Sequence, residues 1–347
     1  MVKYSASGVF QWLIQGGGYT YDNCYGVSVD SAGYAYIAGY FSGSSANFGS
    51  IVLTNVSFDN EGFVIKVSPV GGYIWARIIS GANDDDARAV DCDNNRVVVG
   101  GVFLSDSIHA GSSSVANSDN SGMSRDYFIA SYDTAGNLQW VTGDGSVGVE
   151  ILVGVAIGGG SAIYVAGNFY TTFTVGSSTV TAGSGTLSDV FVAGYTSGGV
   201  GAWAKAAGGT NNDYCEGIAA DSAGNICITG YYKSSMITFN QTWTCTNANY
   251  DVFVAAVHST TDVHDAENPS TFVLFPNPAG ETTTIQPGVA LHDVSVKVFS
   301  ATGQMVYEKN YLSNDTAEID CRNFESGIYF VQLSSGTEVS VQKLLVE

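Results

Sequence analysis

Few side chains in this sequence have the type and spacing that acid–base or nucleophilic chemistry needs. Of the four histidines, His258, His264 and His292 lie at the end of the repeats, in the linker region or in the C-terminal segment, which leaves His109 within the repeats. A serine or cysteine nucleophile requires a base within hydrogen-bonding reach. One histidine in a polar stretch supports such a site poorly, so we expect His109 to be a solvated loop residue and predict no catalytic residue.

Carboxylates are the other candidates, because glycoside hydrolysis uses a pair of them. Asp84, Asp85 and Asp86 lie just before a predicted strand, and Asp22 and Asp213 occupy aligned positions in other repeats. A recurring acid is typical of a turn or cap, whereas an active site is needed only once. We therefore expect structural roles for these aspartates, and an enzyme that uses loop carboxylates is the alternative.

One carboxylate motif resembles the start of a calcium-binding loop. Asp91, Asp93 and Asn95 form the pattern D-x-D-x-N. The sixth position is Arg96 where the calcium loop needs glycine, and the twelfth is Val102 where it needs glutamate. We therefore expect a polar hairpin turn here, and the sequence predicts neither a metal nor a cofactor.

The composition excludes several classes of partner. Twelve Lys and Arg against 32 Asp and Glu give a net charge of −20, which disfavours nucleic acid and anionic lipid as ligands. No apolar stretch is long enough to form a transmembrane segment. The six cysteines include no CxxC pair, which argues against zinc. A bridge between Cys227 and Cys245 is left open.

The elements that position these residues repeat along the chain. Tryptophan recurs at spacings of 63, 65 and 63 residues (75 − 12, 140 − 75 and 203 − 140). The recurring residues are Trp12, Trp75, Trp140 and Trp203. They define units at about 12–74, 75–139, 140–202 and 203–258, which together with the first residues make a first domain of residues 1–259.

Each unit has the pattern of several short strands. A stretch of small and β-branched residues, such as GVSVD at 26–30, is followed by a turn and a second strand, such as YAYIAGYF at 34–41. After a Gly/Ser-rich stretch comes an acidic residue two positions before a phenylalanine, and another strand follows. These phenylalanines are Phe63, Phe128, Phe191 and Phe253.

A period of about 63 residues with four or so strands predicts an all-β array of the β-propeller type. A four-stranded sheet buries both faces only when neighbouring sheets stack on it. The GVSVD-type strands have small residues that permit close approach, so we place them innermost. The recurring tryptophans and phenylalanines are expected to fill the core between sheets.

These residues resemble bacterial β-propeller repeats of the SBBP type. The shared pattern is W-A-x-x-x-G, then x-V-D-x-x-G-N-x-Y-V-x-G, then D-x-F-V-A-K-Y, over about residues 1–258. The third unit departs from it, because Gly158 stands where we align Asp30, Asp91 and Asp221 in the others. The resemblance implies a fold and says nothing of a ligand.

The first residues of the sequence align with the interior of a repeat, since Lys3 and Trp12 match Lys66 and Trp75. Either this stretch closes a ring by pairing with the last unit, or the sequence lacks earlier repeats and an export signal. The fourth unit already has its own strand, DVFVAAV, so we favour the second interpretation.

The composition changes after the fourth unit. Residues 260–270 are polar without periodicity, which predicts a linker. In residues 271–347, strand-length runs such as VSVKVFS and GIYFVQL are separated by turn residues. This pattern predicts a second domain that is a small, Ig-like antiparallel β-sandwich.

The second domain resembles the type A C-terminal sorting domain of the Bacteroidetes type IX secretion system. Four stretches carry the resemblance: LFPNP at 274–278, VKVFSATGQMV at 296–306, GIYFVQL at 327–333 and the terminal QKLLVE. It implies recognition by the type IX secretion machinery and passage through the periplasm and the outer membrane. The residues it assigns to the sorting signal are Pro276, Asn277, Pro278, Gly303, Gly327, Tyr329 and Lys343. An accessory sandwich without a sorting role is the alternative.

We therefore expect a secreted or cell-surface cargo whose repeats act as a binding, adhesion or structural module. The Gly/Ser/Thr-rich loops at 104–124 and 170–188 would contact a glycan or protein ligand. A glycan-active enzyme and a surface-layer or filament component are the alternative functions.

Overall fold

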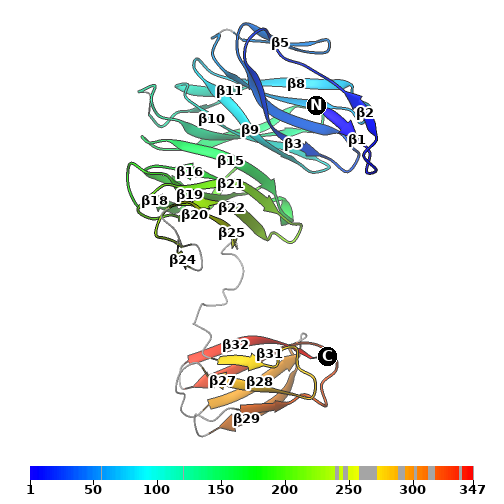
Figure 1. The fold of residues 1–347 in the computed structure, drawn as a ribbon, viewed down its shortest axis with the longest axis vertical. Helices are drawn as coiled ribbons and strands as arrows, with labels where there is room; N and C mark the ends of the chain where they lie inside the picture. The colour runs from blue at the N-terminus through cyan, green and yellow to red at the C-terminus, as the bar shows by residue number, and fades with distance from the viewer. Residues whose placement is uncertain are drawn as a thin grey trace. The chain divides into compact units, whose positions relative to one another are not determined.

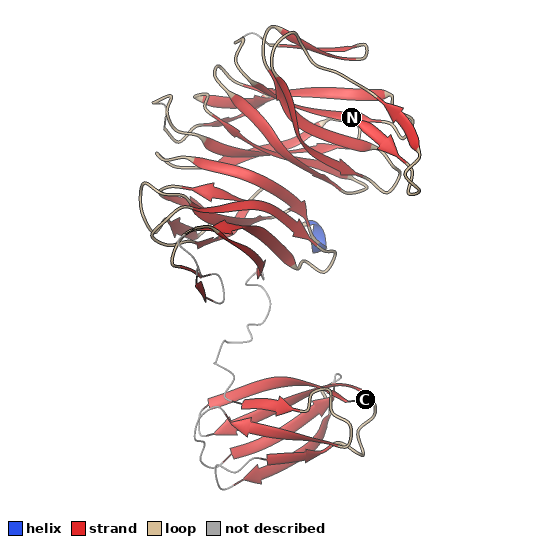
Figure 2. Cartoon of the chain, in the orientation of Figure 1, coloured by secondary structure: helices blue, strands red, loops and turns tan. Residues whose placement is uncertain are grey.

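The computed structural model describes residues 1–55, 57–119, 121–238, 242–244, 249–257, 272–287, 294–300, 303–311, 317–335 and 338–346. Within these residues the fold is all-β, and the helical content is one short 3-10 turn, Gly159–Ser161 (Figure 2). In this part of the chain no helix is long and apolar enough to cross a membrane. The chain divides into two compact units, Met1–Ser259 and Thr260–Glu347. The predicted linker at 260–270 lies outside the described residues.

The longer strands of the first unit form four antiparallel sheets that follow one another along the chain, named here sheets 1 to 4 (Figure 1). Within each of these sheets, the strands pair in the order in which they follow one another along the chain. The strands are β3 (Asp22–Val29), β4 (Ala35–Phe41), β7 (Glu61–Val67) and β8 (Tyr73–Ser80) in sheet 1; β9 (Asp85–Cys92), β10 (Arg96–Phe103), β13 (Asp126–Asp133) and β14 (Leu138–Asp144) in sheet 2; β15 (Glu150–Ile157), β16 (Ile163–Phe169), β19 (Asp189–Tyr195) and β20 (Gly201–Ala207) in sheet 3; and β21 (Asp213–Ala220), β22 (Ile226–Tyr232) and β25 (Asp251–Val257) in sheet 4.

Along the chain, a small hairpin lies between the second and third strands of each of the four sheets. In space, the hairpin that follows the second strand of sheet 2 is hydrogen-bonded to the fourth strand of sheet 1. The hairpins are β5–β6 (Ser45–Phe48 and Ile51–Thr54), β11–β12 (Ser107–Ala110 and Ser113–Ala116), β17–β18 (Thr172–Val175 and Ser178–Thr181) and β23–β24 (Met236–Thr238 and Thr242–Thr244). The stretches 104–124 and 170–188, expected as loops, therefore contain strands. Alternate residues of these strands, such as Phe173 and Val175, are buried, which fixes an extended conformation.

The boundaries of the sheets differ from those of the units that were defined as beginning at tryptophan. Trp75 lies on β8, Trp140 on β14 and Trp203 on β20, each the fourth strand of a sheet. A unit that begins at tryptophan therefore gives its first strand to the preceding sheet. A sequence period fixes the length of a repeat and leaves its starting point undetermined, which is why the boundaries differ.

The strand register corrects the alignment of the second unit. Asp30 and Asp221 directly follow the first strands β3 and β21, whereas Asp91 lies inside β9 and the residue that follows β9 is Asp93. Asp93, like Asp30, accepts two backbone N–H hydrogen bonds from the turn after it. The turn between the first and second strands is one residue shorter in the second unit. The sequence pattern V-D therefore aligned Asp91 with Asp30, whereas the structure aligns Asp93 with it.

Neighbouring sheets share a hydrophobic core. At each boundary, the residue that follows the recurring phenylalanine of one sheet belongs to the same hydrophobic cluster as a β-branched residue on the first strand of the next sheet. Each such contact buries apolar surface that a lone sheet would expose, at about 25 cal/mol per Å². The three pairs, called here the interface pairs, are Val64 with Val90, Ile129 with Val155, and Val192 with Ile218.

Each recurring phenylalanine packs on a glycine of the adjacent second strand. A Cβ atom built on Gly39 would lie 2.9 Å from the ring of Phe63 and would also clash with the carbonyl oxygen of Asn23. Gly101, Gly167 and Gly230 meet the phenylalanines of the other sheets in the same way. The glycine in the repeating pattern is therefore required by close packing of the ring.

The first strands of successive sheets lie against one another. A Cβ atom on Gly26 would lie 3.0 Å from the backbone nitrogen of Val90 in the next sheet. The Asp91 carboxylate accepts a hydrogen bond from Ser28 Oγ at 2.9 Å and from the backbone N–H of Ile157 at 2.8 Å. One side chain of sheet 2 thus joins the first strands of three sheets.

The four sheets form an open array, so a closed propeller is not observed. The hairpin of β1 (Val2–Tyr4) and β2 (Phe10–Leu13) pairs within itself, and β25 pairs with β22. In the described residues, the first strand pair does not join the last sheet, so ring closure through that pairing is not observed. In the described residues, Val29 on β3 is 58% exposed and Val254 on β25 is 70% exposed.

The second unit is a two-sheet sandwich. One sheet has the order β26–β27–β30, and the other β29–β28–β31–β32. Val296, Val331 and Leu344 are among the side chains of the core between them. The strands are β26 (Phe272–Phe275), β27 (Thr282–Pro287), β28 (Val294–Ser300), β29 (Met305–Tyr311), β30 (Ala317–Asp320), β31 (Gly327–Ser335) and β32 (Glu338–Val346).

Candidate functional site

Six acidic residues are buried where one sheet meets the next. Each pair combines the acid that begins a third strand with the acid that begins the first strand of the next sheet, 24 residues later (85 − 61, 150 − 126 and 213 − 189). Each of the six residues is 3% exposed or less. We call them the boundary carboxylates: Glu61 and Asp85, Asp126 and Glu150, and Asp189 and Asp213.

The first pair is held by hydroxyl and backbone donors. Asp85 Oδ2 accepts a hydrogen bond from Ser105 Oγ at 2.9 Å. Glu61 accepts one from Ser57 Oγ at 2.6 Å and one from the backbone N–H of Gly81 at 3.2 Å. Because Gly81 lies in the crossover between sheets 1 and 2, this pair fixes the path of the chain from one sheet to the next.

The second pair has one oxygen without a partner. Glu150 accepts hydrogen bonds from Ser146 Oγ at 2.7 Å and from the Ser146 backbone N–H at 2.9 Å. Asp126 Oδ2 accepts one from the backbone N–H of Ser118 at 2.6 Å. Among the described residues, the buried Oδ1 of Asp126 has no hydrogen-bond partner. A protonated carboxyl needs fewer donors than a carboxylate, so protonation of this pair suits its surroundings.

The third pair repeats the arrangement of the first. Asp213 Oδ2 accepts a hydrogen bond from Ser234 Oγ at 2.6 Å, and Ser234 follows the second strand of its sheet as Ser105 does. Asp189 accepts hydrogen bonds from the backbone N–H of Gly183 at 2.6 Å and of Gly209 at 3.3 Å. The crossover to sheet 4 is therefore fixed in the same manner.

Burial raises the pKa of these carboxyls. The pKa of Asp85 rises to about 8, that of Glu61 and of Glu150 to about 7, and that of Asp189 to about 6. Loss of solvent is the largest cause in each, and the hydrogen-bond donors lower the pKa. The other acid of the pair raises the pKa of Asp85, Glu150 and Asp189 further, whereas Asp59 and Asp84 raise that of Glu61. The pKa of Asp126 is also raised by burial.

The arrangement of the boundary carboxylates favours a structural role. The same pair occurs at three boundaries, and its oxygens are bonded to the local backbone. In the described part of the chain, no group of three or more His, Cys, Asp or Glu is placed to hold a metal ion. Sequence analysis found Asp85 and Asp213 as recurring acids but missed their partners, which the constant spacing of 24 residues could have revealed.

The carboxylates of the fragment that resembles a calcium loop accept hydrogen bonds from the protein itself. Asp93 accepts hydrogen bonds from the backbone of the β9–β10 turn and pairs with Arg96 at 3.2 Å. Asp91 bonds to neighbouring sheets, as described above. His109 lies on β11 with its side chain exposed, and its Nε2 is 3.1 Å from Ser107 Oγ.

The described residues include one of the two cysteines of the possible bridge and the recurring tryptophans. Cys227 is exposed on β22, and Cys245, with which a bridge was left open, lies outside the described residues. The recurring tryptophans anchor one sheet to the next: the indole N–H of Trp75 donates to the Thr134 carbonyl at 3.2 Å, and that of Trp140 to the Ser197 carbonyl at 3.1 Å. Both carbonyls lie in the turn between the third and fourth strands of the following sheet.

Trp12 and Trp203, the first and last of the recurring tryptophans, can be compared with Trp75 and Trp140. Trp12 donates to the carbonyl of Pro69 at 2.9 Å, so the hairpin β1–β2 lies on sheet 1 as β7–β8 lies on sheet 2. Trp203 is half-buried on β20, and the turn that corresponds to it follows β25, outside the described residues. Sequence analysis assigned these rings to the core and missed the N–H donors, whose acceptors are backbone atoms without a side-chain signature.

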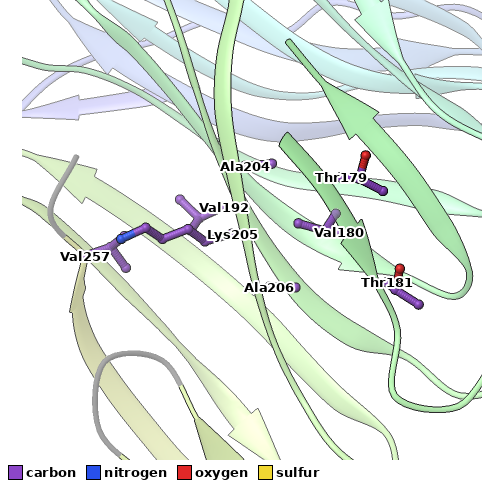
Figure 3. A pocket seen from close by; sticks show the side chains of 8 residues that line it. All are labelled: Thr179, Val180, Thr181, Val192, Ala204, Lys205, Ala206 and Val257. Atoms are coloured by element: carbon purple, nitrogen blue, oxygen red, sulfur yellow. The ribbon is translucent and has the colours of Figure 1, made fainter. Parts of the chain in front are cut away.

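A cavity of about 470 Å³ lies beside the fourth strand of sheet 3 (Figure 3). Thr179 and Thr181 of β18 contribute hydroxyls, Lys205 of β20 contributes an ammonium group, and the remaining surface is apolar. The apolar residues are Val180, Val192, Ala204, Ala206 and Val257. Hydroxyls and one cation beside an apolar wall can bind a polar ligand but supply no acid–base pair.

In the second unit, Asn277 fixes the last strand of the chain. Its Nδ2 donates to the carbonyl of Lys343 at 2.7 Å, and its Oδ1 accepts from the backbone N–H of Leu345 at 2.9 Å. The backbone N–H of Ala279 donates to the carbonyl of Leu345 at 2.7 Å. The segment that contains the FPNP motif therefore holds β32 by its backbone.

The other residues assigned to the sorting signal lie at turns and strands around this contact. Pro276 and Pro278 flank Asn277 and are exposed, while the Lys343 side chain is exposed on β32. The Tyr329 ring is buried and stacks on Phe324 at 4.9 Å. Gly303 has a φ of 84°, which allows the turn before β29, and Gly327 begins β31.

Comparison with known proteins identifies the second unit. Residues 273–347 match the family model described as the secretion system C-terminal sorting domain, which confirms the sorting domain expected from the sequence. No curated relative matches the chain. A dimeric latent PorU from Porphyromonas gingivalis is similar at 12% identity over 93% of this chain and 32% of that chain, with a TM-score of 0.19. The chain thus spans about a third of that structure, and so low a score supports no inference about the fold.

The sorting domain indicates how the protein is exported. It directs a cargo to the type IX secretion machinery, with export to the cell surface or the extracellular space. The boundary carboxylates, the tryptophan anchors and the cavity all belong to the cargo, the repeat unit.

The raised pKa of Glu150 predicts that acid stabilises the repeat unit. The folded state binds this proton more tightly than the unfolded state, so the stabilisation is full below pH 4.5 and is lost as the pH rises through about 7. The variant Glu150→Gln mimics the protonated form. Between pH 5 and 8.5 we expect it to lose less unfolding free energy than the unmodified protein, by on the order of 2–3 kcal/mol. Urea unfolding followed by tryptophan fluorescence measures this, since every tryptophan lies before residue 260.

The matched control for this prediction is Asp133→Asn. Hydrogen bonds from its turn lower the pKa of Asp133, so its titration affects stability only below about pH 4. If Glu150→Gln loses stability as steeply as the unmodified protein between pH 5 and 8.5, the Glu150 carboxyl is not protonated in the folded state.

Proposed function

We propose that the protein is an exported cargo whose repeat unit is a binding or adhesion module displayed at the cell surface or released. The observation that supports this best is the combination of a sorting domain with a repeat unit whose acidic groups are committed to holding the fold. The resemblance of the repeats to the SBBP type agrees with such a module, and its propeller-like packing is part of this proposal.

The sorting signal is proposed to be the folded surface around β32. Ile328 and Phe330 on β31 pair in register with Leu345 and Lys343 on β32. These side chains lie on the outer face of the sheet, where Phe330 is 42% exposed and Leu345 is 37% exposed. Because Asn277 holds β32 in this sheet, a recognition surface made of both strands depends on that contact.

The ligand site of the repeat unit is proposed to be the cavity beside β20. Thr172 and Thr174 pair through their hydroxyls with Thr181 and Thr179 across the β17–β18 hairpin, at 3.0 and 2.9 Å. This row of hydroxyls next to Lys205 suits a hydroxyl-rich or anionic ligand such as a glycan. We propose that binding proceeds without turnover, because the boundary carboxylates that a glycosidase would need are buried away from this cavity.

Loss of the Asn277 side chain should reduce export. Asn277→Ala removes two hydrogen bonds to β32, about 1–2 kcal/mol of local stability. In a host with a type IX secretion system we expect the exported fraction to fall several-fold and protease cleavage of the last strand to increase. Asn310→Ala on β29, an exposed residue, is the control and should be exported normally. Normal export of Asn277→Ala with a loosened last strand would contradict the proposal.

A glycan array tests the binding role of the repeat unit. We expect specific retention of the exported protein on a subset of glycans without release of product, and weaker retention of the Lys205→Met variant. Product formation would instead support the glycan-active enzyme, and no retention on glycans or surface proteins would leave a structural component.

A further inference from the structure

We propose that the first strands of sheets 1 and 2 carry a second ligand site, which binds a neutral glycan. It adds to the proposed binding role and does not depend on the cavity beside β20. Two observations point to it: a β-bulge that recurs in the first strand of each of the four sheets, and two buried polar atoms that have no partner within the described residues. The residues of this site, called here the bulge site, are Tyr25, Tyr40, Asp86 and Arg88.

A β-bulge interrupts the first strand of each of the four sheets. In β3, Cys24 and Gly26 face successive residues of β4, so Tyr25 between them is the extra residue. The same shift in register occurs in β9, β15 and β21. A bulge leaves its extra residue out of the ladder and re-aims its side chain. The four extra residues are Tyr25, Arg88, Val153 and Glu216.

The type of side chain at the bulge differs from sheet to sheet. The bulge recurs, as the packing residues do, but its side chain is aromatic in one sheet and cationic, apolar or acidic in the others. All four side chains are at least partly exposed, and Tyr25 is 48% exposed. The exposure of this position therefore does not depend on where a sheet stands in the array. A backbone position that the fold keeps, with a side chain that the fold leaves free to vary, suits recognition of a ligand.

The bulged residues of sheets 1 and 2 meet, because β3 contacts β9 (Figure 1). The guanidinium group of Arg88 lies over the ring of Tyr25, 5.7 Å from its centroid. The ring of Tyr40 lies beside that of Tyr25, with the two centroids 5.9 Å apart. The face of an aromatic ring is electron-rich, so it attracts the C–H groups on the apolar face of a sugar ring as it attracts a cation. The exposed part of this ring pair is a platform for one sugar unit.

Asp86 and Arg88 have an acceptor and a donor that the protein leaves unused. Arg88 Nη2 donates to Asp86 Oδ2 at 3.1 Å. Among the described residues, Asp86 Oδ1 and Arg88 Nε are buried without a hydrogen-bond partner, and Asp86 is 6% exposed. An unpaired buried polar atom is costly, so a partner from outside the chain is expected. A sugar hydroxyl both donates and accepts, and therefore suits both atoms. The Arg88 side chain is 29% exposed, so we expect its rotation to open them to a ligand.

The charges around the bulge site favour a neutral ligand. The one cation of the site, Arg88, is already paired with Asp86. Burial raises the pKa of the Tyr40 phenol, and nearby carboxylates, among them Asp86 and Asp84, raise it further. The phenol therefore stays protonated and can donate to a hydroxyl, whereas the carboxylates repel an anion. A sulfated or phosphorylated ligand is disfavoured, as the net charge of −20 also implies.

The experiment uses the full-length protein. An array of neutral glycans selects the probe, and isothermal titration calorimetry then measures its Kd. We expect Tyr25→Ala to raise the Kd about tenfold or more, because the platform is lost. Tyr25→Phe keeps the ring and should bind as the unmodified protein does. Because Tyr25 is half exposed, neither substitution should disturb the fold, which urea unfolding verifies.

Tyr4→Ala is the matched control, because Tyr4 is 57% exposed and its ring packs on Phe10, outside the bulge site. It should bind as the unmodified protein does. Lys205→Met separates this site from the cavity. Weaker binding in Tyr25→Ala but not in Lys205→Met supports the bulge site, and weaker binding in both supports both sites. Weaker binding in Lys205→Met alone overturns the bulge site and leaves the cavity.

Two further results would overturn the bulge site. One is that the unmodified protein binds no neutral glycan on the array. The other is that Tyr25→Phe binds as weakly as Tyr25→Ala, since the ring would then not be what holds the sugar.

Discussion

A β-sheet with apolar side chains on both faces is stable only when both faces are covered, and this constraint organises the repeat unit. Each sheet provides a third strand that is apolar on the side of its successor, and each successor meets it with the small residues of its first strand. Val64 and Val90, which belong to one hydrophobic cluster, are one instance of an arrangement that recurs at the three boundaries between sheets 1 to 4. The stability of any sheet is therefore shared with its neighbours, as expected for a repeat array.

The polar groups at the boundaries solve a second problem. The chain must cross from the fourth strand of one sheet to the first strand of the next, and its backbone N–H groups there need acceptors. The boundary carboxylates supply them, at the cost of burying acidic groups whose pKa then rises. On the opposite side, tryptophan N–H groups bind turn carbonyls of the following sheet. Hydrogen bonds at both ends of the strands thus fix how each sheet is aligned on the next.

Much of this fold is predictable from the sequence because its signals are periodic. The spacing of tryptophan and phenylalanine gives the repeat length, and alternation in VSVKVFS gives a buried face with Val296 and Val298. The phase of the repeats was not predictable, since a period has no starting point. The hairpin at β17–β18 was missed because its composition is that of a loop, and burial of Phe173 decides its structure.

The site was harder to predict than the fold. The role of Asn277 depends on a strand 66 residues away, and its partners are backbone atoms. The acceptors of the tryptophan N–H groups are likewise backbone carbonyls, which have no residue type. The boundary carboxylates had a signal, the constant 24-residue spacing, but it acquires meaning only once two sheets are known to meet there. Long-range contacts to the backbone are therefore what sequence patterns leave undetermined.

Hydrogen exchange of the first strands, measured in dilute protein by mass spectrometry, tests the central claim most directly. β3, β9 and β15 are each hydrogen-bonded to one neighbouring strand in their sheets, so they differ mainly in whether a preceding sheet covers them. If stacking of sheets supplies the stability, β9 and β15 should exchange more slowly than β3 by at least about tenfold. Equal exchange in the three strands would contradict the account.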